Sequence, residues 1–178
     1  MNTSRLLFAG SLTLTLTLTL LGTAVPSQAQ VAASAGDARP AILRALDGSW
    51  RMAGDVRGKP VTYAMTAAPA LNGTFTEMRM KDVQVPARYE AVVFIGVDPA
   101  SQAVIAHWID SFGPKHSIPH ATGRIAGNTI QLLFPYQGGD FRNALSYDPD
   151  TASWTFVLES AQPDGSWKHF ARYEVRRN

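Results

Sequence analysis

The sequence of 178 residues contains no cysteine. Its fold therefore cannot depend on disulfide bonds, and a metal site built from thiolates is excluded. A cysteine nucleophile is excluded for the same reason. A chain of this length nevertheless buries about two-thirds of the surface that its unfolded form exposes, so a hydrophobic core can stabilise it without covalent links.

A cluster of like charges is also missing. The 16 Lys and Arg residues and the 14 Asp and Glu residues give a formal net charge of +2, and the two signs are interleaved along the chain. Proteins that bind nucleic acid concentrate their basic residues on one stripe or face. The sequence therefore argues against nucleic acid as a partner and gives no reason to expect strong binding to a membrane surface.

Motifs of several enzyme classes are absent as well. No Gly-x-Ser-x-Gly elbow for a serine nucleophile occurs. The glycines at 54 and 58 are not followed by the Lys and Ser/Thr of a phosphate-binding loop. Glu90 and Glu159 remain candidates for the paired carboxylates of a glycosidase. An enzyme that uses a carboxylate or histidine base is therefore kept as an alternative.

The first 29 residues have the pattern of an export signal. Arg5 supplies a positive charge, Leu6–Val25 contains no acidic residue, and Ser27-Gln28-Ala29 offers small residues at a cleavage site. We predict cleavage after Ala29, a periplasmic or secreted protein, and no stable membrane insertion after cleavage. A retained membrane anchor is the alternative, because the apolar run is just long enough to span a bilayer.

Residues 30–39 are predicted to form a flexible, alanine-rich lead. Residues 40–178 are predicted to form one folded domain. A short helix is expected over Pro40–Leu46, because proline suits the first helical position and the apolar residues fall on one side. Gly48 is suited to end the helical turn.

After Gly48 the sequence consists of short runs that are rich in β-branched and aromatic residues. Turn pairs such as Asn72-Gly73, Gly127-Asn128 and Asp164-Gly165 tolerate positive φ and separate several of the runs. This spacing is typical of an antiparallel β-barrel or sandwich. The ten predicted strands are Ser49–Val56, Pro60–Ala67, Thr74–Lys81, Tyr89–Val97, Val104–Ser111, Ala121–Ile125, Thr129–Phe134, Phe141–Tyr147, Trp154–Ser160 and Trp167–Arg176.

Alternation along these strands divides the side chains between two faces. In Val104–Ser111, Trp108 and Asp110 share one face and His107 lies on the other. An interior of aromatic residues with a few opposed charges would suit a largely apolar ligand with one polar end. The predicted ligand-binding residues are Glu90, Trp108, Asp110, Arg79 and Arg172, with the two arginines as counter-charges.

The histidines give a weaker indication of a metal or haem site. His107, His116 and His120 lie close to a carboxylate in the sequence, but their spacing matches no metal-binding motif. Strict alternation places His169 on the same face as Ala171, where a neutral imidazole could ligate haem iron if that face points inward. We predict no metal and no cofactor, and keep a haem-binding barrel as an alternative.

The opening Gly48-Ser49-Trp50 after a short helical turn resembles that of the calycin superfamily, which includes the lipocalins. In lipocalins this Trp packs at the closed end against an Arg of the last strand, and the resemblance implies Arg172 or Arg176 in that role. Nearly the whole mature chain also resembles an uncharacterised bacterial family of calycin-like barrels that often follow a signal peptide. The matching segments include Leu71-Asn72-Gly73-Thr74-Phe75, Tyr89-Glu90-Ala91, Gly96-Val97-Asp98-Pro99, His107-Trp108-Ile109-Asp110-Ser111, Pro163-Asp164-Gly165 and Tyr173-Glu174-Val175-Arg176.

These resemblances imply a barrel of about ten antiparallel strands in meander order, with a short N-terminal helix and no established activity. Nitrobindin-like haem barrels have a similar opening but are more distant. The chain departs from the bacterial family after Ser111, where Phe112-Gly113-Pro114-Lys115-His116 replaces a small loop that contains Thr. The resulting hypothesis is an exported barrel that binds a small apolar or amphipathic molecule. A structural barrel filled by its own side chains is a further alternative.

Overall fold

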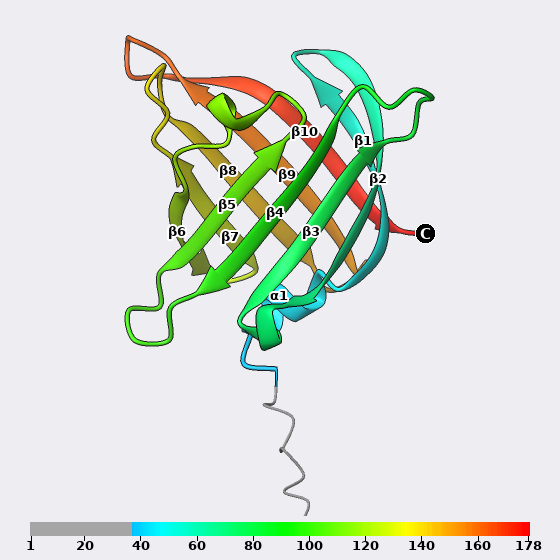
Figure 1. The fold of residues 1–178 in the computed structure, drawn as a ribbon, viewed down its shortest axis with the longest axis vertical. Helices are drawn as coiled ribbons and strands as arrows, with labels where there is room; N and C mark the ends of the chain where they lie inside the picture. The colour runs from blue at the N-terminus through cyan, green and yellow to red at the C-terminus, as the bar shows by residue number, and fades with distance from the viewer. Residues whose placement is uncertain (1–36) are drawn as a thin grey trace, which may run out of the picture. The chain divides into compact units, whose positions relative to one another are not determined.

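The computed structural model describes residues 37–178, so the predicted export signal and residues 30–36 lie outside the described residues. Residues 37–178 contain a closed antiparallel barrel of ten strands, each paired with the next along the chain (Figure 1). The first strand pairs with the last. The predicted all-β class, the strand number and the closure of the barrel are confirmed.

The elements have the following bounds. The strands are β1 (Gly48–Val56), β2 (Lys59–Ala70), β3 (Phe75–Asp82), β4 (Glu90–Val97), β5 (Val104–Asp110), β6 (Ala121–Ala126), β7 (Thr129–Phe134), β8 (Phe141–Asp148), β9 (Ser153–Ala161) and β10 (Trp167–Arg177). A short helix α1 (Ala41–Ala45) precedes them, and two 3-10 turns, η1 (Leu71–Gly73) and η2 (Pro114–His116), lie in loops. Within residues 37–178, no helix has the length and apolar character needed to cross a membrane.

Alternation along the strands builds the core. On β3, for example, Thr76, Met78 and Met80 are buried and Arg79 between them is exposed. Large side chains occupy the interior from every part of the sheet, as is usual for barrels of this size. Those that are almost completely buried include Trp50, Met52, Met65, Met78, Ile95, Ile130, Phe134, Trp154 and Phe156.

The end of the barrel at which α1 lies is called the closed end (Figure 1). Leu43 and Leu46 of the helical segment are completely buried and belong to the core. The indole Nε1 of Trp50 donates a hydrogen bond to the carbonyl of Leu46 at 2.6 Å. Trp50 therefore joins the helical turn to the first strand.

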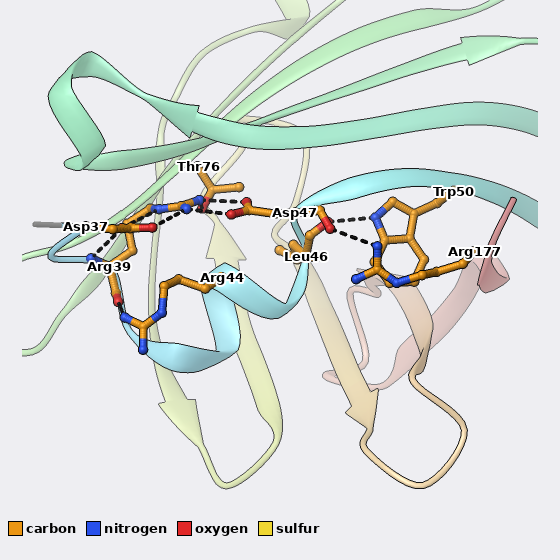
Figure 2. A network of polar contacts seen from close by, with 8 residues as sticks. All are labelled: Asp37, Arg39, Arg44, Leu46, Asp47, Trp50, Thr76 and Arg177. Carbon is orange, nitrogen blue, oxygen red and sulfur yellow. Dashed lines mark hydrogen bonds and ion pairs between the residues drawn. The ribbon is translucent and has the colours of Figure 1, made fainter.

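The guanidinium of Arg177 lies over one face of this indole (Figure 2). Its guanidinium carbon lies 4.2 Å from the centroid of the Trp50 ring, and the two residues are paired directly across β1 and β10. The expectation that Arg172 or Arg176 takes this position is wrong. Both have even numbers, and from Ala171 onward the inward residues of β10 are odd, whereas Arg177 lies on the same face as the buried Val175.

Another arginine at the closed end, Arg39, is buried, although the sequence analysis assigns it to the flexible lead. The Arg39 side chain is 1% exposed and forms ion pairs with Asp37 at 2.6 Å and Asp47 at 2.7 Å. It also donates to the hydroxyl of Thr76 at 2.8 Å (Figure 2). These contacts hold the segment that precedes α1 against β3.

We expect replacement of Arg39 by Met to lower the free energy of unfolding by about 2 kcal/mol, because the buried guanidinium and its hydrogen bonds to Thr76 and to two partly exposed carboxylates are lost. Urea unfolding measures the change. Arg172→Met is the control, since Arg172 pairs with Glu174 on the surface, and an exposed pair contributes at most about 1 kcal/mol. Equal losses in the two variants would contradict the structural role of Arg39.

The same network predicts an acid-sensitive component of stability. Hydrogen bonds from Arg39 lower the pKa of Asp37 from 3.8 to about 2. Because the folded-state pKa is depressed, this contribution is complete above the unfolded value and is lost as the pH falls from 3.8 to about 2. We expect Asp37→Asn to flatten the dependence of the free energy of unfolding on pH in this interval. An unchanged slope would contradict the assignment.

Candidate binding site at the barrel mouth

The end of the barrel opposite α1 is called the mouth, and it is formed by the connections at residues 57–58, 83–89, 111–120, 135–140 and 162–166 (Figure 1). The side chains just inside this end are mostly aromatic. Tyr63 contacts Tyr89 with ring centroids 5.6 Å apart, and it contacts Tyr173 at 5.8 Å. These three rings come from β2, from the residue that precedes β4, and from β10.

The row of rings continues on the other side of the barrel. Trp108 of β5 contacts Phe134 of β7 edge-to-face, and Phe134 stacks on Tyr136. Tyr136 contacts Phe141 of β8, whose ring lies 5.0 Å from that of Phe170 on β10. We call these eight residues the aromatic collar: Tyr63, Tyr89, Trp108, Phe134, Tyr136, Phe141, Phe170 and Tyr173.

One carboxylate faces the collar. Trp108 Nε1 donates to the hydroxyl of Tyr89 at 3.0 Å, and that hydroxyl donates to Asp110 Oδ2 at 3.3 Å. The backbone N–H of Phe112 donates to Asp110 Oδ1 at 2.9 Å. No Lys, Arg or His within residues 37–178 forms an ion pair with Asp110. Because a carboxylate accepts about four hydrogen bonds, Asp110 retains acceptor capacity for a further donor.

The four tyrosines of the collar have raised pKa values, which favours their neutral form. Burial is the main cause that raises the pKa of Tyr63, Tyr89, Tyr136 and Tyr173. The charge of Asp110 adds to the increase for Tyr89 and Tyr136. These hydroxyls therefore act as hydrogen-bond donors at neutral pH and are unsuited to act as bases.

The strand β5 is only partly paired beside this site. It pairs with β6 from Val104 to Ala106, and Ala106 lies opposite Ala121, the first residue of β6, so His107 to Asp110 have no partner on that strand. The loop at residues 111–120 passes this part of β5 instead. Trp108 and Asp110 consequently lie where the mouth has no neighbouring strand on one side.

A depression of about 650 Å³ adjoins the mouth on the outer wall of β2 to β5. Its lining includes Tyr89 and Asp110 together with the predicted ligand-binding residues Arg79 and Glu90. Arg79 and Glu90 point outward, however, and they are not inside the barrel as an opposed interior pair would require. Glu90 pairs with Lys81 at 2.7 Å, and Arg79 pairs with Glu77.

Arg172 lies far from Asp110 in the sheet order and is not a counter-charge in the mouth. It is on the outer face of β10 and pairs with Glu174 at 3.2 Å. Glu159 is also on the outer face and pairs with Arg142 at 2.6 Å. Glu90 and Glu159 therefore form ion pairs with different basic side chains on separate strands, and the structure does not bring them together as a catalytic pair.

A β-bulge changes the prediction for His169. The register of β10 against β9 shifts between His169 and Ala171, so Phe170 packs on the core and His169 faces outward. His169 contacts Asp55 on the outer face of β1 at 2.8 Å. The imidazole is therefore not oriented to ligate haem iron inside the barrel.

Two of the three remaining histidines, His107 and His120, form a pair. The rings of His107 and His120 lie 5.5 Å apart at the outer face of β5. Among residues 37–178 there is no group of three or more His, Cys, Asp or Glu side chains arranged to hold a metal ion. Trp108 and Asp110 are thus the predicted site residues that the structure places together inside the mouth.

Most of the collar was not singled out from the sequence, although a signal for it was present. Tyr63, Phe141 and Tyr173 each lie on the buried face of a strand toward the mouth. Alternation predicts their faces, but their proximity depends on the shear of the barrel and on the bulge before Ala171.

The chain matches no protein-family model, and a search of curated proteins finds no match either.

The collar predicts unusual behaviour in alkaline solution. Because the folded-state pKa values of four tyrosines are raised, their contribution to stability is present below the ordinary value of about 10 and is lost as the pH rises. We expect fewer than the five tyrosines of the chain to ionise in the folded protein at about pH 11. Ultraviolet titration with and without denaturant measures this, and Tyr89→Phe should remove one late-ionising group. Ionisation of all five near pH 10 in the folded protein would contradict the analysis.

Proposed function

We propose that the mature protein is exported and binds a small, largely apolar molecule in its mouth, with the polar end of the ligand at Asp110. The observation that carries this proposal is the aromatic collar at the mouth beside Asp110, a carboxylate that forms no ion pair with a basic side chain of residues 37–178. Collar members Tyr89, Trp108 and Phe170 are only partly buried, so apolar surface is left for a ligand to cover.

The polar end of the ligand is expected to donate a hydrogen bond. Tyr89 and the backbone of Phe112 already orient both oxygens of Asp110, so the ligand need not arrange the carboxylate. Preorganised polar groups within an apolar lining are typical of small-molecule sites. The interior below the collar is filled by the core side chains, which favours a ligand that sits at the mouth over one that occupies the whole barrel.

A structural barrel without a ligand is the second candidate. The packed interior favours it, because a filled barrel needs no ligand for stability. The two candidates differ in the native mass of the mature protein purified from the periplasm. An additional mass that disappears on denaturation supports binding, and it also gives the molecular weight of the ligand.

A binding experiment can use N-phenyl-1-naphthylamine, an apolar fluorescent molecule with one N–H donor. We expect its fluorescence to increase with the wild-type protein and Asp110→Asn to weaken binding about tenfold, because the charged acceptor of the hydrogen bond becomes a neutral amide oxygen. Trp108→Phe should also weaken binding. These effects are measured by titration at constant protein concentration.

Two matched controls accompany this titration. Glu159→Gln removes one carboxylate from the outer face, and Trp167→Phe alters an indole that stacks under Arg142 at 4.5 Å outside the collar. Both controls should bind the probe as the wild type does. Equal losses in control and site variants, or no binding by the wild type, would overturn the proposal in favour of a structural barrel.

A further inference from the structure

The exposed apolar side chains of the barrel are concentrated at the mouth. Val85 is 98% exposed, Phe112 is 68% exposed and Ile118 is 69% exposed. Val83 is also exposed, and these four residues belong to the loops at 83–89 and 111–120. We call them the apolar rim: Val83, Val85, Phe112 and Ile118.

The two loops lie side by side. They connect to β4 and β5, which are neighbours in the sheet, and Ser111 N–H donates to the carbonyl of Glu90 at 2.9 Å. The rings of Phe112 and Tyr89 are 5.5 Å apart. The rim is therefore a feature of one side of the mouth and borders directly on the collar.

Hydrogen bonds at the base of each loop fix this arrangement. Asp82 accepts bonds from the backbone N–H groups of Gln84 and Arg88 at 3.0 and 3.3 Å. Asp110 accepts from Phe112 N–H with its side chain and from Gly113 N–H with its carbonyl. The loops are thus held in shape while their apolar side chains remain in water, which is the reverse of the usual preference for burial.

The charges of the two loops have a single sign. Residues 83–89 and 111–120 contain Arg88, Lys115, His116 and His120, and they contain no Asp or Glu. The carboxylates that support them, Asp82 and Asp110, accept hydrogen bonds from the loop backbone. A surface that combines protruding apolar side chains with basic ones complements an anionic lipid bilayer.

We propose that the apolar rim docks the barrel on the surface of an anionic lipid bilayer. Val85, Phe112 and Ile118 would enter the boundary between headgroups and acyl chains, and Arg88 and Lys115 would contact the headgroups. A bilayer suits these residues better than a protein partner does, because they project singly from loops and form no flat, closely packed face. This proposal goes beyond ligand binding, since the rim and the collar are different sets of residues.

The test is co-sedimentation of the mature protein with vesicles. We expect binding to vesicles of phosphatidylglycerol and phosphatidylethanolamine in equal parts, weaker binding to phosphatidylcholine alone, and weaker binding at high salt. The double variant Val85→Asp/Phe112→Asp should bind the anionic vesicles at least tenfold more weakly. Both positions are exposed, so circular dichroism and urea unfolding should show an unchanged fold.

Leu71→Asp is the matched control. Leu71 is 65% exposed and lies at the closed end of the barrel, so the same chemical change there should leave vesicle binding intact. Equal losses in this control and in the double variant would overturn the assignment to the rim. Absence of wild-type protein from every vesicle pellet would overturn membrane docking and leave a protein partner as the occupant. Titration with N-phenyl-1-naphthylamine without vesicles tests the collar separately, so the two proposals can fail independently.

Discussion

Pairing of the first strand with the last is the constraint on which the rest of this structure depends. β1 and β10 are in register from Trp50 opposite Arg177 to Val56 opposite Ala171, and this seam leaves the sheet without an edge. The two backbones approach closely at Gly54, where an added Cβ would lie 1.9 Å from the carbonyl oxygen of Arg172. A side chain at this position would force the seam apart, so the glycine is needed for closure.

Contacts at the closed end hold the beginning of this seam in place. Trp50 is held between the Leu46 carbonyl and the Arg177 guanidinium, while Arg39 ties the preceding segment to β3 (Figure 2). Every polar group in this network has a partner, and the arginine at its centre is buried. The opposite end of the barrel is the mouth, where aromatic and apolar side chains remain accessible to solvent.

The sequence was sufficient to predict the barrel because local signals and global closure agree. Each predicted strand overlaps an observed one, and alternation correctly places Trp108 and Asp110 on the inner face of β5. One feature was not predictable from local sequence. The bulge that turns His169 outward is an irregularity of the pairing between β9 and β10, and no residue type within the strand predicts it.

Charged residues on strands were harder to place for a physical reason. Glu90 was predicted to line an interior pocket, with Arg79 and Arg172 as counter-charges. Each of the three instead has a partner of opposite sign on the outer face. Exposed pairs of this kind need no desolvation, whereas an interior pair does. Arg39 is the opposite case, since nothing in an alanine-rich lead predicts that its guanidinium meets Asp37 and Asp47 in a buried site.

Asp110 connects the two features of the mouth. One oxygen accepts the hydroxyl of Tyr89 in the collar, and the other accepts the backbone N–H of Phe112 in the apolar rim. A donor that binds this carboxylate would therefore act on a group that also shapes the rim loop. If docking and ligand binding both occur, a coupling between them must be reciprocal, so a ligand that favours the docked loop is itself bound more tightly at the bilayer. A barrel whose ligand is apolar would then load or release that ligand where the lipid is.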